Sequence, residues 1–257
     1  MRVMNTMGTP SEDRARGTAS AEEIARFTAL AEDWWDEEGP FRPLHRLNPV
    51  RIAYIRDRAT EHFRIAPGSE RPLDGLTAID IGCGGGLVSE PLARLGARVT
   101  AIDASQESVR IAQLHAERQH LDVEYRAGVP EDLAAEGRQF DLVVAMEVVE
   151  HVADLDAFLG SCARLVKPGG ALAMATLNRT VKSMLFAKVG AEYVLRWLPI
   201  GTHNWRKFIG PAELAAGLRR HGVEMLDAKG MTYAPVSGTW RLSYDLDVNY
   251  IAFASRR

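Results

Sequence analysis

The chain has 257 residues, of which 46% are hydrophobic and 25% are charged, and its formal net charge at pH 7 is −3. This composition indicates a globular protein with a large core and excludes wholesale disorder. Because Lys and Arg are scattered rather than gathered in a basic stripe, a nucleic-acid-binding protein is disfavoured.

The cellular compartment can also be inferred. Cys83 and Cys162 lack the spacing of a metal-binding pair, and no secretory segment precedes them. No apolar run approaches the roughly 20 residues that span a bilayer. We therefore expect a cytoplasmic protein that does not cross a membrane.

The N-terminal part divides into a leader and a helical cap. Residues 1–19 carry almost no apolar pattern, which predicts a disordered leader. Ser20 and Glu23 then have the spacing of a capping box, and apolar residues follow at helical spacing. After a proline-rich stretch expected to form turns, a second helix is predicted over about 49–63. Residues 20–72 thus form a predicted N-terminal helical cap.

The remaining residues, 73–257, alternate between short apolar strands and helical segments. This alternation predicts a parallel sheet with right-handed crossovers. We expect an α/β domain with a doubly wound, mostly parallel, seven-stranded sheet. The expected strands are 77–82, 97–103, 123–128, 142–146, 171–177, 223–228 and 247–255, and the expected helices are 87–95, 105–120, 157–165 and 211–222.

A glycine loop follows the first strand. In AIDIGCGGGL the glycines stand at 82, 84 and 86, and such a loop brings bare backbone close to a ligand. The dinucleotide fingerprint GxGxxG would need a small residue at Leu87, so a nucleotide-dependent oxidoreductase is disfavoured. Asp80 precedes the loop, and Asp103 ends the next strand, where a carboxylate would bind ribose hydroxyls. The alternative is a tight structural turn followed by a solvated Asp.

These residues resemble the class I methyltransferases that use S-adenosylmethionine. The resemblance implies that the loop, with Gly82 and Gly84, lies beside the methionine part of the cofactor. It implies that Asp103 holds the ribose and that Asp80 helps to orient the amino group. Residues around Glu131, after the third strand, would lie near the adenine.

Longer stretches resemble one family more narrowly, the ubiquinone biosynthesis O-methyltransferases. They are FRPLHRLNPVR (41–51), DIGCGGG (80–86), MEVVEHV (146–152), LVKPGG with TLNR (165–179), VGAEYVLRWLPIGTHNW (189–205), KFIGPAEL (207–214) and DLDVNY (245–250). The matches span roughly residues 22 to 250. This family methylates a catechol-type hydroxyl of polyprenylated ubiquinone precursors at two steps, and the resemblance implies the same reaction here.

The family resemblance adds two cofactor residues. It implies that Arg51 binds the cofactor carboxylate, as its charge suits, and that Met146 contacts the cofactor. From the sequence alone, a surface residue after a proline turn is the preferred interpretation of Arg51, and only the resemblance favours a cofactor role. The resemblance also implies a quinone-biosynthesis complex as a partner.

The end of the fourth strand, MEVVEHV, carries the candidate catalytic residues. If a helical turn begins there, Glu147, Glu150 and His151 share one face. A phenolic hydroxyl has a pKa near 10, so it needs a general base or a divalent cation to react at neutral pH. The three side chains could ligate Mg²⁺ or Zn²⁺, and ExxEH resembles a metal-binding set in eukaryotic members of the family. We hypothesise a metal site.

Two alternatives to the metal site stay open. His151 could instead act as the general base. The glutamates could also simply favour the positive end of a helix, with His151 packed nearby.

Residues 178–206 form an insertion after the fifth strand. A broad apolar stripe, flanked by basic residues and bearing Trp, is typical of segments that lie at a membrane interface. We expect a lid that contacts anionic lipid at the inner face of the cell membrane, where a polyprenylated substrate resides. An ordinary lid helix packed on the domain is the alternative.

Two further functions are weighed against O-methylation. One is a methyltransferase, acting on oxygen or carbon, for another small phenolic or lipid substrate. The other is a non-catalytic cofactor-binding protein. The MEVVEH segment favours activation of a hydroxyl, which carbon methylation does not need.

Overall fold

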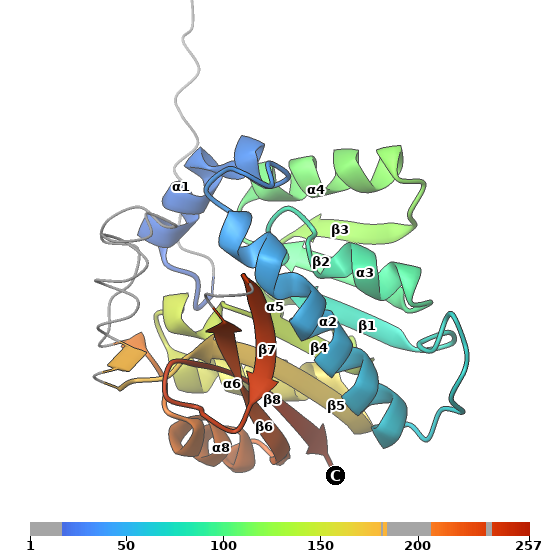
Figure 1. Ribbon diagram of the computed structural model, residues 1–257, viewed down its shortest axis with the longest axis vertical. Coiled ribbons are helices and arrows are strands. Elements are labelled where there is room, and N and C mark those ends of the chain that lie inside the picture. Colours follow the sequence, from blue (N-terminus) through green and yellow to red (C-terminus); the bar gives the residue numbers. More distant parts are fainter. Residues whose placement is uncertain (1–16, 181, 184–206, 235–237) are drawn as a thin grey trace, which may run out of the picture.

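The computed structural model describes residues 17–180, 182–183, 207–234 and 238–257. A single sheet has the strand order β3-β2-β1-β4-β5-β8-β6-β7, with helices on both faces (Figure 1). The strands are β1 (Thr77–Ile81), β2 (Arg98–Asp103), β3 (Val123–Ala127), β4 (Phe140–Met146), β5 (Val166–Leu177), β6 (Val223–Ala234), β7 (Thr239–Ser243) and β8 (Asn249–Arg256). The helices are α1 (Ala21–Ala29), α2 (Arg42–His62), α3 (Ser89–Arg94), α4 (Gln106–Arg118), α5 (Pro130–Ala135), α6 (Leu155–Leu165) and α8 (Pro211–Arg220), with 3₁₀ turns η1 (Ala31–Asp33) and η2 (Val149–His151).

The order of the strands reverses between β1 and β4. β1 pairs in parallel with β2 on one side and with β4 on the other, while β8 runs antiparallel to β5 and β6. In open α/β sheets, ligands bind beyond the carboxyl ends of the strands at such a reversal. The expected doubly wound, mostly parallel fold is confirmed, and it marks the ends of β1 and β4 as the place for a site.

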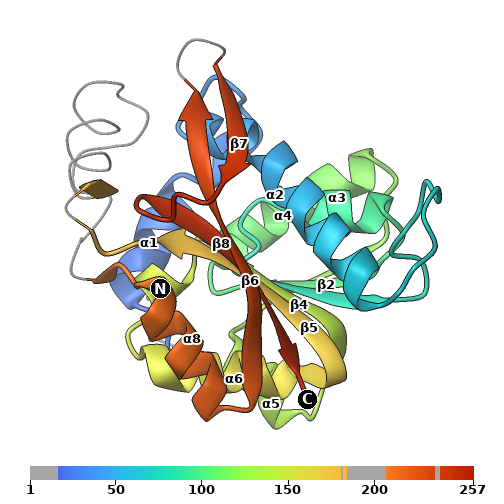
Figure 2. The same ribbon diagram turned by 60° about the horizontal axis from the view of Figure 1, so that its bottom comes forward.

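The two faces of the sheet bury separate cores, because successive side chains of a strand point to opposite faces. Figure 2 shows α5, α6 and α8 on one face of the sheet and α2 and α3 on the other. Ile79 and Ile81 of β1 belong to the first core, and Ala78 belongs to the second. By the same alternation, Asp80 points toward α2 and α3. An acid that is only 2% exposed is thus carried to the face that those two helices cover.

The sheet has eight strands, whereas the sequence predicted seven. β6 continues beyond the predicted strand 223–228 to Ala234, and β7 pairs antiparallel with its last five residues, Gly230–Ala234. Three of the five β7 residues are exposed, and none is fully buried. Trp240 and Leu242 alternate with polar residues in β7, but two apolar residues in a run of five are a weak signal, and the prediction passed over them.

α2 begins well before the predicted start near residue 49. The proline-rich stretch expected to form turns is its first half. Pro43 lies in the first helical turn, where the missing N–H has no intrahelical partner to lose. Pro49 removes one helical hydrogen bond, but burial of Leu47 and Ile55 on the same helix supplies packing that holds the helix together.

The N-terminal segment departs from the prediction in two ways. Thr18 is buried, and its carbonyl accepts a hydrogen bond from the Ala153 N–H at 2.8 Å, so the end of the expected leader is packed against the domain. α1 follows Ser20 as predicted, but the Ser20 side chain makes no capping bond, and Glu23 instead contacts His151. The predicted capping box is therefore wrong.

Two expectations fall largely outside this description. Residues 1–16 of the leader and most of the 178–206 insertion are not among the described residues. Within the described ranges, no helix has both the length and the apolar character needed to cross a bilayer.

Candidate active site

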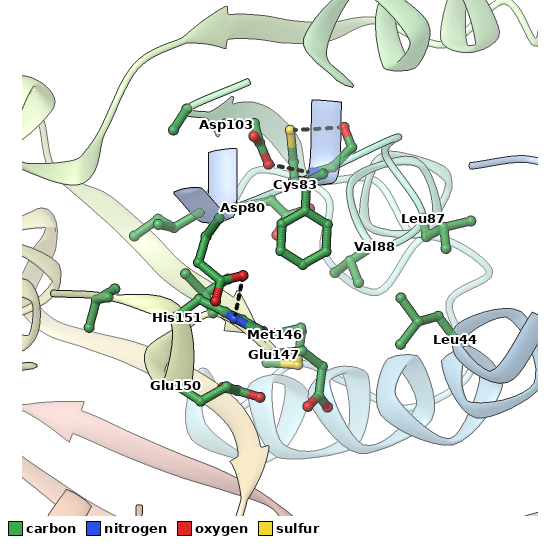
Figure 3. Close-up of a pocket in the computed structure, with 18 of the residues that line it drawn as sticks. Leu44, Asp80, Cys83, Leu87, Val88, Asp103, Met146, Glu147, Glu150 and His151 are labelled. Atoms are coloured by element: carbon green, nitrogen blue, oxygen red, sulfur yellow. Dashed lines mark hydrogen bonds and ion pairs between the residues drawn. The ribbon is translucent and has the colours of Figure 1, made fainter. Parts of the chain in front are cut away.

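A cavity of about 300 Å³ opens at the carboxyl ends of the parallel strands, a size within the range of small-molecule sites. The side chains that extend into it come from α1 and α2 as well as from the strand ends. All nine predicted site residues line this one cavity: Arg51, Asp80, Gly82, Gly84, Asp103, Met146, Glu147, Glu150 and His151. Figure 3 labels Asp80, Asp103, Met146, Glu147, Glu150 and His151 among them. Their individual roles stay predictions.

The glycine loop is held in a backbone conformation that other residues rarely adopt. Gly82 and Gly84 have φ angles of 71° and 51°, in the left-handed region. Space is also lacking, because a Cβ at Gly82 would overlap Val148 and one at Gly84 would overlap the Trp34 ring. The loop therefore presents bare backbone to the cavity for two independent reasons.

Asp103 fastens the loop to the end of β2. Its Oδ2 accepts the Gly84 N–H at 2.9 Å, and its Oδ1 accepts the Ser105 N–H at 2.8 Å. Burial raises the pKa of Asp103, while these two backbone hydrogen bonds oppose the rise. Each oxygen keeps a second lone pair, so the carboxylate can still accept ribose hydroxyls.

Asp80 is the acid most affected by its surroundings. Its Oδ2 accepts a hydrogen bond from Ser89 Oγ at 2.6 Å. Burial raises the pKa of Asp80 to about 6, although Ser89 and the charge of Arg51 act in the opposite direction. A cationic group placed beside Asp80 would stabilise its ionised form, so this carboxylate suits an ammonium group.

Arg51 is a buried cation whose hydrogen bonds are incomplete. The residue is 2% exposed, and its guanidinium lies 3.9 Å from Glu147 Oε1. Its hydrogen bond to the Leu44 carbonyl is long, at 3.4 Å. Its Nε has no hydrogen-bond partner among the described residues. Because a buried guanidinium without a partner is costly, this geometry favours a bound anion such as a ligand carboxylate.

The MEVVEHV segment does not form the expected helical face. Glu147 has a φ of 57°, and the 3₁₀ turn η2 covers only Val149–His151. Glu147 therefore leaves the turn and extends toward Arg51. Burial and the nearby Glu150 raise the pKa of Glu147, with Arg51 opposing them. The prediction that Glu147, Glu150 and His151 share one helical face is wrong.

Two of the three candidate metal ligands are engaged by other side chains. Glu150 is 3% exposed and accepts a hydrogen bond from Thr176 Oγ1 at 2.7 Å, while His151 Nδ1 lies 3.2 Å from Glu23 Oε2. Among the residues that the structure describes, no three His, Cys, Asp or Glu side chains are gathered as a metal ion requires. This arrangement does not fit a divalent cation at the ExxEH segment.

Sequence reasoning missed the contribution of the N-terminal cap to the cavity. Glu23 and Phe27 of α1 contact His151, and Trp34 lies against the glycine loop. The available signal was that Glu23 and Phe27 stand four residues apart, on one face of a helix. We had assigned that spacing to capping and packing.

The cavity is strongly acidic. Over the described part of the chain, its acidic and basic lining residues are five carboxylic acids, one arginine and one histidine: Glu23, Asp80, Asp103, Glu147, Glu150, Arg51 and His151. Five acids shielded from water favour a cationic ligand over the phosphates of a dinucleotide.

Comparison with known proteins identifies the family. A family model described as a methyltransferase domain matches residues 79–174. The ubiquinone biosynthesis O-methyltransferase of Parvibaculum lavamentivorans is 49% identical over 250 residues, which cover 97% of this chain and 99% of that protein. The enzyme of the same name from Paramagnetospirillum magneticum is 54% identical over 237 residues, covering 92% and 95%. The chain belongs to the ubiquinone biosynthesis O-methyltransferase family.

A solved structure supports the fold assignment. A magnesium protoporphyrin IX methyltransferase from Synechocystis PCC 6803, with bound SAH, superposes with a TM-score of 0.63 at 21% identity, covering 92% of this chain and 100% of that one. This likeness concerns the fold alone. The resemblance to the ubiquinone biosynthesis O-methyltransferases and the class I methyltransferase fold are both confirmed.

Proposed function

We propose that this protein transfers the methyl group of S-adenosylmethionine to a catechol-type hydroxyl of polyprenylated ubiquinone precursors. The two substrates are a 2-polyprenyl-6-hydroxyphenol and a 3-demethylubiquinol, one for each O-methylation step. One observation carries the proposal, namely that the glycine loop and His151 line the same acidic cavity. The family name of the half-identical relatives supports the reaction class.

Three side chains suit the polar groups of the cofactor. Arg51 has an unpartnered Nε for the cofactor carboxylate, and Asp80 provides a buried acid for its amino group. Asp103 provides lone pairs for the ribose hydroxyls. When bound, S-adenosylmethionine supplies a methyl group already activated on a sulfonium, so the protein's tasks are to align the reactants and to remove the hydroxyl proton.

His151 is the proposed base. Nδ1 lies 3.2 Å from Glu23 Oε2, which leaves Nε2 as the nitrogen proposed to take the proton from the phenolic hydroxyl. The phenolic oxygen forms a bond to the methyl carbon as the bond from that carbon to sulfur breaks, leaving S-adenosylhomocysteine. Burial lowers the pKa of His151, but Glu23 and the charge of Glu150 outweigh this effect and raise it above its usual value. A general base of this kind contributes about 10²–10⁴-fold to the rate.

Deprotonation by a divalent cation, Mg²⁺ or Zn²⁺, is the alternative to a protein base. Its ligands would be Glu147, Glu150 and His151, which do not converge in this structure, and two of which are engaged by Thr176 and Glu23. We derive no step through a metal, and activity after chelation decides between the two routes.

The insertion 178–206 is proposed to contact the membrane that holds the polyprenylated substrate. Its apolar stripe and flanking basic residues support this proposal. Flotation with vesicles of phosphatidylcholine and phosphatidylglycerol tests it. Binding to these vesicles that falls as salt rises supports the contact, whereas no binding to them contradicts it.

The reaction itself is tested with methyl-labelled S-adenosylmethionine and two short-prenyl substrates, one a 2-prenyl-6-hydroxyphenol and one a 3-demethylubiquinol. We expect label in a methoxy group of each product, located by NMR. An analogue with both oxygens already methylated is the control and should remain unlabelled. Label on ring carbon, or no product from either substrate, would contradict the proposal.

A further inference from the structure

We propose that Glu23 is a positioning residue for His151, holding the imidazole so that Nε2 meets the substrate hydroxyl. The inference rests on the proposed function, because it gives His151 a reason to be held. It assigns a part in the reaction to α1, a helix that lies outside the sheet and its strand-end loops.

One face of α1 holds the imidazole at two points. Glu23 Oε2 lies 3.2 Å from His151 Nδ1, and the Phe27 ring meets the imidazole edge-to-face with centroids 5.4 Å apart. Glu23 and Phe27 are four residues apart, so both project from one side of the helix. The carboxylate fixes which nitrogen is protonated, and the aromatic ring limits rotation of the imidazole.

The backbone beside α1 is fastened to the segment that follows His151. The Ala153 N–H donates to the Thr18 carbonyl at 2.8 Å, and Ala19 forms an antiparallel bridge with Val152. Thr18 Oγ1 also donates to Glu131 at the start of α5. Because these contacts tie the chain just before α1 to the residues just after His151, the approach of Glu23 to His151 is fixed by the fold.

The charged neighbours of His151 leave Glu23 as its partner at Nδ1. Glu150 also faces the imidazole, but its Oε2 is occupied by the Thr176 hydroxyl. Arg26 lies 3.7 Å from Glu23 and opposes protonation of His151, and Lys207 acts on Glu23 from a greater distance. The carboxylate of Glu23, 3.2 Å from Nδ1, stabilises the imidazolium that forms when Nε2 takes the proton.

The test replaces Glu23 by Gln, which keeps the shape of the side chain and removes the charge. We expect kcat to fall by about 10–100-fold, as for other partners that orient a functional imidazole, with cofactor affinity and the melting temperature unchanged. Glu22→Gln is the matched control, because Glu22 is an exposed acid in the same first turn of α1. It should behave like the wild type.

A second readout separates positioning from a merely structural role. A catechol bearing an electron-withdrawing group is already ionised at the assay pH, so it needs no base. With this substrate, the rate of Glu23→Gln should return close to that of the wild type. A variant that stays slow with the ionised substrate, or one that is fully active with the ordinary substrate, would overturn the inference.

His151→Ala distinguishes failure of this inference from failure of the proposed function. If His151→Ala is slow while Glu23→Gln is normal, His151 is the base and only the role of Glu23 is wrong. If His151→Ala is fully active, the proposed base is wrong, and the role of Glu23 fails with it.

Discussion

The cavity has two halves that are built differently. The cofactor half consists of backbone and acids at the ends of neighbouring strands, with Gly82, Asp80 and Asp103 close together in the sequence. The base half combines the turn after β4 with a face of α1. Glu23 therefore contacts a histidine that follows it in the chain only after the first four strands. The sheet positions the loop and the two acids of the first half, and α2 adds Arg51 to it. The second half depends on α1 for the contact between Glu23 and His151.

This difference has a functional consequence. One fold serves methyltransferases of different specificity, as the likeness to the magnesium protoporphyrin IX methyltransferase at 21% identity illustrates. Reaction chemistry depends on what the cap and the β4 turn bring to the same cavity. Changes in the two halves should therefore affect different measurements, with cofactor affinity responding to one half and the chemical step to the other.

The largest effect is expected in the base half. His151→Ala should lower the single-turnover rate by about 10²–10⁴-fold, because the hydroxyl loses its base. Cofactor affinity, measured by calorimetry, should be unchanged. His62→Ala, which removes an imidazole outside the cavity, is the control. Equal losses of rate and affinity would show that the halves are not separable.

The next largest effect is expected in the cofactor half. Arg51→Ala removes a charge-assisted hydrogen bond of about 1.5–3 kcal/mol, so the cofactor Kd should rise roughly 10–100-fold. At saturating cofactor, much of the rate should return. Arg56→Ala alters an exposed residue of the same helix and should leave the Kd unchanged. Normal affinity in Arg51→Ala would contradict the assignment of Arg51.

The glycine loop allows a paired comparison of stability. In Gly84→Ala the new Cβ would sit on a left-handed backbone and overlap the Trp34 ring. In Gly137→Ala the backbone is also left-handed, at a φ of 72°, but no atom lies within 4 Å of the new Cβ. Backbone strain of about 1–3 kcal/mol applies to both variants. Gly84→Ala should therefore melt at a lower temperature than Gly137→Ala, by roughly 2–4 °C for each further kcal/mol. Equal melting temperatures would mean that Trp34 moves aside freely.

The smallest effect is a pH dependence in the cofactor half. Burial raises the pKa of Asp80 to about 6, so the folded protein without cofactor binds more protons than the unfolded chain between about pH 4 and 6. Stability from this group therefore falls as pH rises through that window, while affinity for the cationic cofactor should increase. Calorimetric titrations at pH 5 and 7 measure the change. Asp80→Asn should weaken binding at pH 7 and remove this dependence, and an unaltered pH profile in the variant would contradict it.

Local patterns in the sequence were enough to predict most of the sheet and the cofactor half. Apolar strands, the glycine loop and Asp103 follow one another closely, and the sheet brings their carboxyl ends together without further information. β7 was missed because its signal is only Trp240 and Leu242 alternating with polar residues over five positions. α2 began earlier than predicted because buried residues such as Leu47 favour the helix despite Pro43 and Pro49.

The base half could be predicted only in part. His151 and Glu150 were identified from their place after β4, but the expected helical face failed because Glu147 adopts a left-handed φ. Glu23 was assigned to a capping box, since a contact between residues so far apart in the sequence leaves no local pattern. Tertiary packing, which decides such contacts, is not encoded in spacing.

The most direct test of the account asks whether a protein base or a cation removes the proton. Methyl transfer to the short-prenyl 2-prenyl-6-hydroxyphenol is measured with chelator-treated protein, before and after adding Mg²⁺ or Zn²⁺. The account predicts full activity after chelation and no gain on adding either ion, since His151 held by Glu23 takes the proton. Activity that is lost on chelation and restored by one of the ions would contradict it and would assign Glu147, Glu150 and His151 as ligands.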